Sequence, residues 1–361
     1  MKIEKTNKKL LQTRIRILLG TIGVSVLLIV LYRVGTTKTG TKETPLEGAE
    51  TSYSFAMGTS VAVSLYDADK ALYSQIEQAI KQLDQEVISW RQDTSELAVL
   101  NHSYRSGEAY TVSDTLYTAI VQSLNICKDS GGALDITIRP LANVWNIENA
   151  TAEDFEIPSY AEINEALKKV GYESVACGDD QTVTINTGDR ILDLGAVGKG
   201  FALDIVEQIL KKESVPGATI SVGGSILVYG SKSDGSSFHV GIRDPEGNAD
   251  DYVGYLELEP DSNLCISTSG DYEKYIEKDG TKYHHILDRA TGYPAATELA
   301  SVTVVCANGL YSDALSTACY VLGYERSQAI LEKYHAEAVF IDHAGNITVT
   351  QGLQEHFHKA E

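Results

Sequence analysis

The amino-acid sequence predicts an α+β fold: a single large domain of mixed, mostly antiparallel sheet with flanking helices, preceded by an N-terminal membrane anchor. Many short strands recur along the chain and amphipathic helices are interleaved with them, which is typical of α+β proteins and not of doubly wound parallel ones. No linker rich in Pro, Gly or Ser divides the chain after Tyr53. With 361 residues, 43% of them hydrophobic, the chain can bury a full core.

The N-terminal segment differs in composition from the rest. Residues 1–16 form a basic head, and residues 17–32 are an uncharged run that spans roughly 24 Å as a helix, slightly less than a hydrocarbon core of about 30 Å. An uncleaved anchor and a cleaved signal peptide both fit this length, and we favour the anchor because no small-x-small cleavage site follows Tyr32. The positive-inside rule then places the basic head in the cytoplasm and the rest outside, in a single-pass protein of the cell membrane. Residues 33–50 form a flexible stalk, and residues 51–356 form the extracytoplasmic domain.

Within the domain, apolar periodicity locates the elements. Residues 60–65 alternate with a period of two and predict a strand, whereas residues 71–90 and 115–127 carry apolar side chains at three- and four-residue steps and predict helices. Ser159 and Glu162 form a capping box at the start of another helix. We expect further strands at 182–185, 191–194, 219–222, 225–229, 239–242, 253–258, 264–267 and 301–306, helices at 312–322 and 325–334, and a final hairpin at 338–341 and 347–350.

The segment from Leu192 to Val206 predicts an apolar strand that breaks at Gly195 and a helix that begins after Lys199. Free N–H groups and the positive dipole end at such a helix start suit a phosphate, and the ammonium of Lys199 can neutralise it. The loop has neither the dinucleotide-binding glycine order nor the Walker spacing, so a tight turn with a solvated lysine is the alternative. Asp193 suits hydrogen bonding to a ring N–H or a sugar, or is an ordinary polar position on a strand face.

Three oxygen-bearing residues, Asp313, Ser316 and Thr317, share one face of a predicted helix at positions i, i+3 and i+4. Together with an exposed backbone carbonyl, such as that of Ala196, they suit Mg²⁺ in an octahedral site. The alternative is that Ser312 or Asp313 caps the start of its own helix. A phosphate-binding loop and a hard-cation site together suggest a nucleotide diphosphate bound through a divalent cation.

Histidines and tryptophans add further candidates. His284 and His285 lie near a carboxylate, an arrangement that suits a general base, but neighbouring residues on a strand point to opposite faces, so only one reaches a given pocket. A glycine-led turn at 131–132 leads into another apolar strand. Trp90 and Trp145 are the only tryptophans, and each either stacks on a planar ligand or packs in the core.

The overall charge limits the classes of partner. The net charge of −20 argues against nucleic acid, because its phosphates would be repelled. A phosphorylated small ligand still needs local positive charge, for which Lys199, Arg243 and a metal ion are the candidates.

In combination, these residues resemble the FAD:protein FMN transferase family, the ApbE-type flavin transferases. The similarity extends from about Met57 to Thr350, nearly the whole predicted domain. The matching segments, in order, are MGTSV from Met57, SWRQDTSELAVLN from Ser89, ALDITIRPLANVWNI from Ala133, LDLGAVGKGFALD from Leu192, SVGGSI from Ser221, GIRDP from Gly241, STSGDYEKY from Ser267, YHHILDRATGYP from Tyr283 and SVTVVCANGLYSDALSTACYVLG from Ser301. Each match alone is weak, and their number and order make the resemblance specific.

The resemblance implies a single α+β domain and a Mg²⁺-dependent flavoprotein transferase. Such an enzyme moves FMN from its substrate FAD to a threonine hydroxyl of an acceptor protein with an FMN-binding domain and releases AMP, a reaction called protein flavinylation. The implied FAD contacts are Met57, Trp90, Ala133, Leu134, Asp135, Asp193, Lys199 and Leu287. The implied metal ligands are the carbonyl of Ala196 and the side chains of Asp313, Ser316 and Thr317. The implied catalytic residues are His285, as the base for the acceptor hydroxyl, and Asp313.

The sequence departs from the family pattern at two positions. Ser316 stands where many members carry aspartate or alanine, and Arg289 stands where the pattern D-P-x-T-G is common. Besides flavinylation, two alternatives remain open. One is hydrolysis of FAD to FMN and AMP by a pyrophosphatase, in which water replaces the threonine, and the other is a non-enzymatic FAD-binding surface protein.

Overall fold

The computed structural model describes residues 49–248 and 250–360, which form one compact unit. The predicted basic head and membrane anchor, and almost all of the predicted stalk, lie outside these residues. No helix in the described ranges is both long and apolar enough to span a membrane.

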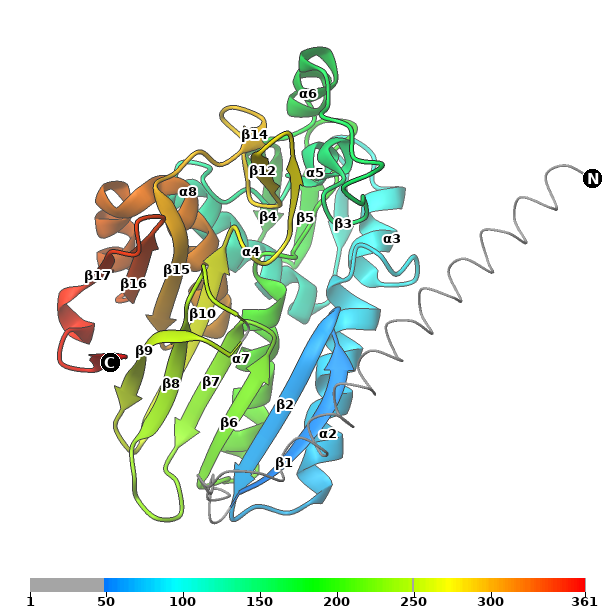
Figure 1. Cartoon of the computed structure of the whole chain (residues 1–361). Helices are drawn as coiled ribbons and strands as arrows, with labels where there is room; N and C mark the ends of the chain where they lie inside the picture. The colour runs from blue at the N-terminus through cyan, green and yellow to red at the C-terminus, as the bar shows by residue number, and fades with distance from the viewer. Residues whose placement is uncertain (1–48, 249, 361) are drawn as a thin grey trace, which may run out of the picture. The chain divides into compact units, whose positions relative to one another are not determined.

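An eight-stranded sheet runs through the unit in the order β1-β2-β6-β7-β10-β15-β16-β17 (Figure 1). Its strands are β1 (Ala49–Ala56), β2 (Thr59–Tyr66), β6 (Gly217–Val222), β7 (Ser225–Gly230), β10 (Ser262–Gly270), β15 (Leu299–Cys306), β16 (Glu337–Asp342) and β17 (Ile347–Val349). Every neighbouring pair in it is antiparallel. The predicted α+β class with a mostly antiparallel sheet is therefore confirmed.

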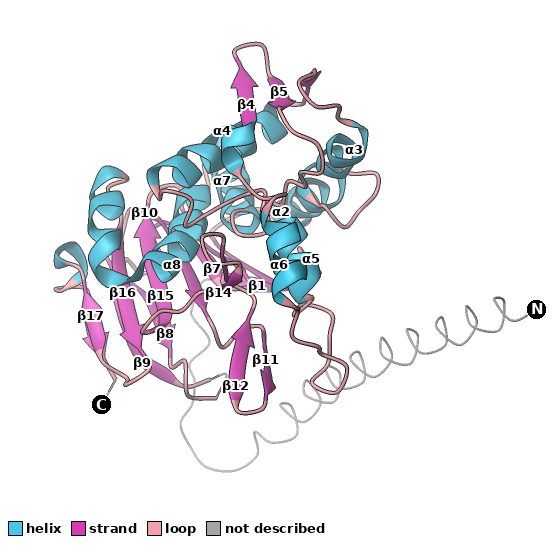
Figure 2. Ribbon diagram, turned by 90° about the horizontal axis from the view of Figure 1, so that it is seen from above, coloured by secondary structure: helices cyan, strands magenta, loops and turns pink. Residues whose placement is uncertain are grey.

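Two helices, α7 (Gly198–Lys212) and α8 (Gly309–Lys333), pack against one face of this sheet (Figure 2). Their buried stripes include Leu203 and Val206 on α7 and Leu315 on α8, at helical spacing, and these side chains join the main hydrophobic core. α8 is interrupted at Gly323, whose φ of 75° and ψ of 170° are not helical. This interruption matches the predicted break between two helices near the C-terminus.

The remaining helices precede α7 in the chain. They are α2 (Ala71–Gln82), α3 (Glu96–Ser103), α4 (Asp114–Asp129), α5 (Arg139–Trp145) and α6 (Tyr160–Leu167). The helix predicted over residues 71–90 is shorter as an α-helix, because a π-helix over Leu83–Ile88 follows α2. The predicted capping box of Ser159 and Glu162 is present at the start of α6.

A second, three-stranded sheet covers part of the opposite face, in the order β18-β9-β8. Its strands are β8 (Phe238–Arg243), β9 (Tyr252–Leu258) and β18 (Phe357–Lys359), the last of which lies beyond residue 356, the predicted end of the domain. The small remaining sheets are formed by β3 (Ala109–Thr111), β5 (Thr182–Ile185) and β4 (Val175–Gly178), by β11 (Tyr275–Lys278) and β12 (Thr281–His284), and by β13 (Leu287–Asp288) and β14 (Tyr293–Pro294).

Two segments predicted as strands are loops instead. The backbone of Leu192 bonds to the side-chain amide of Asn101 in both directions, at 2.8 and 2.9 Å, so a side chain takes the place of a neighbouring strand. The N–H of Asp193 donates to the carbonyl of Ile136 at 2.7 Å. The strand predictions for 191–194 and for the residues after the glycine pair at 131–132 are therefore wrong, and the two loops found there are bonded to each other.

Candidate active site

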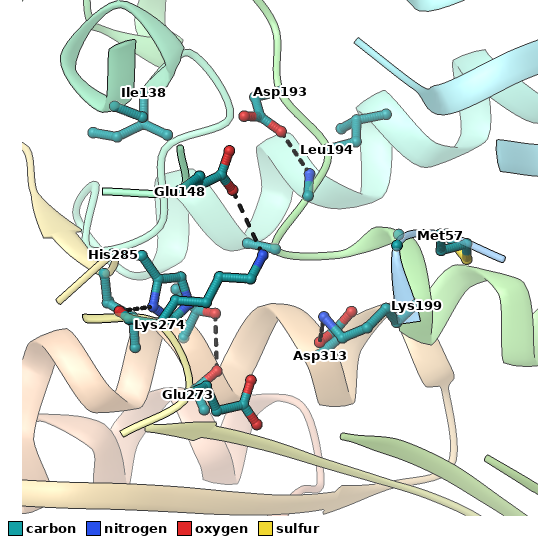
Figure 3. Close-up of a pocket in the computed structure, with 18 of the residues that line it drawn as sticks. Met57, Ile138, Glu148, Asp193, Leu194, Lys199, Glu273, Lys274, His285 and Asp313 are labelled. Atoms are coloured by element: carbon teal, nitrogen blue, oxygen red, sulfur yellow. Dashed lines mark hydrogen bonds and ion pairs between the residues drawn. The ribbon is translucent and has the colours of Figure 1, made fainter. Parts of the chain in front are cut away.

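A cavity of about 320 Å³ lies where these two loops meet the start of α7 and the second turn of α8 (Figure 3). The turn after β1, the end of β10 with the loop that follows it, and residues 285–287 also line it, as do parts of 84–91 and 138–148 and the glycine pair 223–224. Segments that are far apart in the sequence thus supply one enclosed surface. The side chains labelled in Figure 3 are polar or charged for the most part.

The structure brings nearly all of the predicted site residues to this cavity. Its lining includes Met57, Trp90, Ala133, Leu134, Asp135, Asp193, Ala196, Lys199, His285, Leu287, Asp313 and Thr317. Ser316 is not among them: it is fully buried, and its hydroxyl lies 2.8 Å from the Asp313 carbonyl and 2.8 Å from the Ser269 hydroxyl. Arg243 also lies outside the lining, with its guanidinium 5.0 Å from the ring centre of Tyr272. This geometry does not support Ser316 as a cation ligand or Arg243 as a phosphate partner.

Asp313 holds the start of the neighbouring helix. Its Oδ2 accepts the N–H of Gly200, in the first turn of α7, at 3.0 Å. α8 is capped by Asn308, whose side chain accepts the N–H of Tyr311 at 2.8 Å, so the alternative in which Asp313 or its neighbour caps its own helix is wrong. A Cβ atom on Gly200 would lie only 1.9 Å from the carbonyl oxygen of Gly309, and glycine is therefore required for this close approach.

The oxygen atoms around Asp313 suit a hard divalent cation. Nζ of Lys199 lies 3.4 Å from Asp313 Oδ1, so this carboxylate oxygen already faces a positive charge. Thr317 follows one turn later and lines the cavity. Among residues 49–248 and 250–360, no backbone N–H bonds to the Ala196 carbonyl, because the N–H of Gly200, four residues on, is used by Asp313. One carboxylate, one hydroxyl and one free carbonyl form a ligand set that Mg²⁺ accepts when waters complete it.

The described part of the chain contains no group of three or more His, Cys, Asp or Glu side chains that could hold a metal ion. A cation at Asp313 would therefore depend on a single carboxylate. Such a site is typical of Mg²⁺ bound jointly with substrate phosphates, because Mg²⁺ keeps several waters and takes only one or two carboxylates from the protein.

His285 is the histidine that faces the cavity. Its backbone N–H donates to the Lys274 carbonyl at 3.0 Å, and its ring Nδ1 lies 3.2 Å from the same oxygen. Because a carbonyl oxygen only accepts, Nδ1 carries the proton and Nε2 keeps its lone pair. Desolvation, reinforced by the charge of Lys274, lowers the pKa of His285 to about 4. His284 is buried with Nε2 3.2 Å from the Ala295 carbonyl, so the prediction that only one of the two reaches the cavity is confirmed.

Arg139 organises the part of the cavity around Asp193. Its Nη1 lies 3.4 Å from Asp193 Oδ2 and 3.2 Å from Glu148 Oε2, and its guanidinium lies 3.5 Å from the ring centre of Trp90. Burial raises the pKa of Asp193, and the charge of Arg139 opposes that shift. The arginine thus fixes a carboxylate and an aromatic face side by side, an arrangement that suits a flat, hydrogen-bonding ring.

Six charged residues of the lining were not among the predicted site residues: Asp84, Arg91, Arg139, Glu148, Glu273 and Lys274. Lys274 Nζ lies 3.8 Å from Glu148, and burial raises the pKa of Glu273. Arg139 stands in the segment ALDITIRPLANVWNI, and Glu273 and Lys274 stand in STSGDYEKY, so the matching motifs contained a signal for these three. Glu148 lies just outside any motif and had none.

The carboxylate of Asp135 is used within the protein. Its Oδ1 accepts the N–H and the hydroxyl of Thr137 at 2.8 and 2.7 Å, and its Oδ2 accepts the N–H of Tyr172 at 3.1 Å and Nη1 of Arg289 at 2.7 Å. Arg289 also pairs with Glu173 at 2.6 Å. With a side chain only 1% exposed, Asp135 has no free oxygen for the cavity, so a contact there would come from its backbone.

Comparisons with known proteins agree with this site. A model of the ApbE family matches residues 57–340. The FAD:protein FMN transferase of Treponema pallidum is 32% identical to this chain over 317 residues, 82% of this chain and 85% of that protein. The crystal structure of the ApbE protein from Thermotoga maritima is similar over 87% of this chain and 100% of its own, with a TM-score of 0.76 and 29% identity. The apo form of the flavinyl transferase ApbE from Pseudomonas stutzeri is similar over 88% and 100%, with a TM-score of 0.73 and 27% identity. The chain therefore belongs to the ApbE family.

Proposed function

We propose that this chain is an FAD:protein FMN transferase, an enzyme that moves FMN from FAD to a threonine hydroxyl of an acceptor protein and releases AMP. Relatives that span most of its length carry that name. Within the chain itself, one observation carries the proposal. A helix start suited to phosphate, an oxygen ligand set and a neutral histidine meet in a single cavity.

The histidine supplies the base. The threonine oxygen forms a bond to the FMN phosphorus while the bond from that phosphorus to the bridging oxygen breaks, and AMP leaves with the bridging oxygen. The hydroxyl proton passes to Nε2 of His285, the ring nitrogen that carries no proton. Because its pKa is about 4, the ring is neutral and ready to accept at physiological pH.

The start of α7 receives the pyrophosphate. The N–H groups of Gly198 and Lys199 and the positive end of the helix dipole favour an anion there, whereas the N–H of Gly200 is already bonded to Asp313. Lys199, on the same turn, adds a mobile positive charge beside Asp313. Asp313, Thr317 and the Ala196 carbonyl would hold Mg²⁺, which when bound neutralises the pyrophosphate and stabilises the leaving AMP.

Other residues that line the cavity would contact FAD and hold it in place. The proposed contacts are Met57, Trp90, Ala133, Leu134, Asp193, Lys199 and Leu287, with Asp135 contributing its backbone. Holding both reacting groups in one cleft supplies the orientation that a two-substrate transfer needs.

The location follows from the N-terminal sequence. We propose that residues 17–32 anchor the chain in the cell membrane and that the domain acts outside the cytoplasm. The acceptor would then be a membrane-associated or secreted protein with an FMN-binding domain that presents its threonine to His285.

The test combines the protein with FAD, Mg²⁺ and a protein that carries an FMN-binding domain, and follows acceptor mass by intact-protein mass spectrometry together with AMP release. We expect the acceptor to gain the mass of one FMN. Asp313→Ala should abolish this gain, whereas Asp250→Ala, at an exposed position outside the lining, should retain it.

The other outcomes separate the alternatives. AMP release without a gain in acceptor mass would favour FAD hydrolysis, and intact FAD throughout would favour a binding protein. Full Mg²⁺-dependent transfer by Asp313→Ala would refute the assigned cation site.

A further inference from the structure

Asp204 is a half-buried carboxylate on α7 that the proposed chemistry does not use. It does not line the cavity. Its Oδ1 accepts the N–H of Gly309 at 2.5 Å, and its Oδ2 accepts the N–H of Leu310 at 2.8 Å. Desolvation raises its pKa to about 6, and these two N–H groups oppose the rise. The Asp204 carboxylate thus lies where burial disfavours its charged form, and its hydrogen-bond partners are the first two residues of α8.

The contact between α7 and α8 is reciprocal. Gly200 and Asp204 on α7 have the same four-residue spacing as Gly309 and Asp313 on α8. The N–H of Gly200 donates to Asp313, and the N–H of Gly309 donates to Asp204. A Cβ on either glycine would collide with the carbonyl oxygen of the other, at 1.9 and 2.2 Å. Each helix thus supplies the aspartate that holds the start of its neighbour.

The two aspartates differ in what else they face. Asp313 lines the cavity and lies 3.4 Å from Nζ of Lys199, whereas Asp204 is outside the lining. Four residues separate Gly309 from Asp313, about one helical turn, so the backbone at the start of α8 determines where this carboxylate lies. The helix cap Asn308 takes a different N–H, that of the third residue of α8. The N–H groups of the first two residues depend on Asp204.

We propose that Asp204 is a positioning residue that sets the Asp313 carboxylate, and with it Thr317, at the distance from the Ala196 carbonyl that a divalent cation requires. The inference rests on the proposed function, because it assumes a cation at Asp313. Asp204 is an outer partner of the site: it contacts no cation and no substrate, and acts only through the backbone of α8. Loss of such an outer partner typically weakens metal affinity by about ten- to a hundredfold.

Asp204→Asn tests the proposal with little change in shape, because the amide keeps one acceptor and turns a donor toward the other N–H. Mg²⁺ binding to the whole chain with FAD bound is measured by calorimetry, and FAD binding without Mg²⁺ by flavin fluorescence. We expect Mg²⁺ affinity to fall by about ten- to a hundredfold. FAD affinity without Mg²⁺ should be unchanged, and excess Mg²⁺ should restore kcat.

A matched control distinguishes a specific effect of Asp204 on the cation site from a general loss of protein stability. Ser113→Ala removes the side-chain cap of α4, which accepts the N–H of Leu116, outside the cavity lining. It should lower the melting temperature and leave Mg²⁺ affinity unchanged. Asp204→Glu keeps the charge and displaces it by one methylene, so it serves if the asparagine variant does not fold, and its Mg²⁺ affinity should also fall.

The outcomes distinguish this inference from the function on which it rests. Wild-type Mg²⁺ affinity in a folded Asp204→Asn or Asp204→Glu variant would overturn the positioning role and leave the proposed transferase intact. Equal loss of Mg²⁺ and FAD affinity in a variant would also overturn it, since the defect would then be general. If the wild-type chain binds no Mg²⁺ even when FAD is present, the cation site fails and the positioning role fails with it.

Discussion

Gly200→Ala should separate α7 from α8 and so damage the cation site without replacing any of its ligands. The added Cβ would lie 1.9 Å from the Gly309 carbonyl oxygen and 2.7 Å from the Asp313 Cβ. Ordinary contact begins at 3.4 Å, so the two backbones must move apart by about 1.5 Å. A carbonyl oxygen cannot rotate away as a flexible side chain can, so we expect a cost at the upper end of the overpacking range, about 3 kcal/mol.

The effect is measured in two ways. Chemical unfolding gives the free energy of unfolding, and calorimetry gives Mg²⁺ affinity with and without FAD. We expect a fall in melting temperature of about 5 °C and loss of most Mg²⁺ affinity. Gly188→Ala is the matched control, because nothing lies within 4 Å of its added Cβ and its φ is not positive. Wild-type stability and Mg²⁺ affinity in Gly200→Ala would refute the close-crossing argument.

Three further results are expected. Lys199→Met should tighten Mg²⁺ binding to the FAD-free chain by up to about fivefold in calorimetry. The reason is that the Lys199 ammonium, 3.4 Å from Asp313 Oδ1, no longer competes with the cation. Weaker binding would contradict this. At saturating Mg²⁺, which offsets protonation of Asp204 near its pKa of about 6, the kcat/KM profile should stay level from pH 8 to about pH 5, since the neutral base is lost only near the His285 pKa of about 4. An acid limb near pH 6.5 under these conditions would count against His285. Arg289→Gln should lower the free energy of unfolding, measured in urea, by about 2 kcal/mol. The substitution removes the guanidinium that pairs with the Asp135 carboxylate, whose side chain is only 1% exposed. Unchanged stability would show that the pair contributes little.

The helices and strands were predictable where one face is buried, because apolar residues then recur with the period of the helix or strand. Alternation in β2 and the apolar stripes of α4 and α7 are signals within one element, and each matches the sequence prediction closely. The two misassigned strands show the limit of that signal. Leu192 and Leu194 are buried and alternate with Asp193 as in a strand, but their segment is held by the side chain of Asn101, which is 91 residues away along the chain from Leu192.

Residues of the candidate site were predictable where the spacing of oxygen-bearing side chains agreed with a family motif. Asp313 and Thr317 share a helix face, and this face lines the cavity. Their helical spacing was therefore enough to predict that they lie together. The contact between Arg139 and Asp193 was not predictable from local sequence, because the two residues are 54 positions apart along the chain. Ser316 illustrates the converse case: its spacing suits a ligand, yet its hydroxyl is fully buried outside the cavity lining, whereas Thr317, which also bonds to Ser269, lines the cavity. Only the three-dimensional structure shows which oxygens remain free.

Ten charged side chains line the cavity, six acidic and four basic. Asp84 accepts the Met57 N–H and Asp135 pairs with Arg289, and the other eight fall into two groups. Around Glu148 the positive side chains Arg91, Arg139 and Lys274 face the negative Glu148 and Asp193, which leaves a formal surplus of one positive charge. Around α8, Lys199 lies 3.4 Å from Asp313 and also acts electrostatically on Glu273, and these three side chains have a formal surplus of one negative charge.

The lining is therefore more positive around Glu148 than around α8. An anionic dinucleotide is drawn toward the first group and repelled by the second until a divalent cation reverses the sign there. The affinity for each of the two ligands should then rise when the other is bound, by the same factor in both directions. In a protein with a net charge of −20, such coupling would make FAD and a divalent cation bind more tightly together than either binds alone.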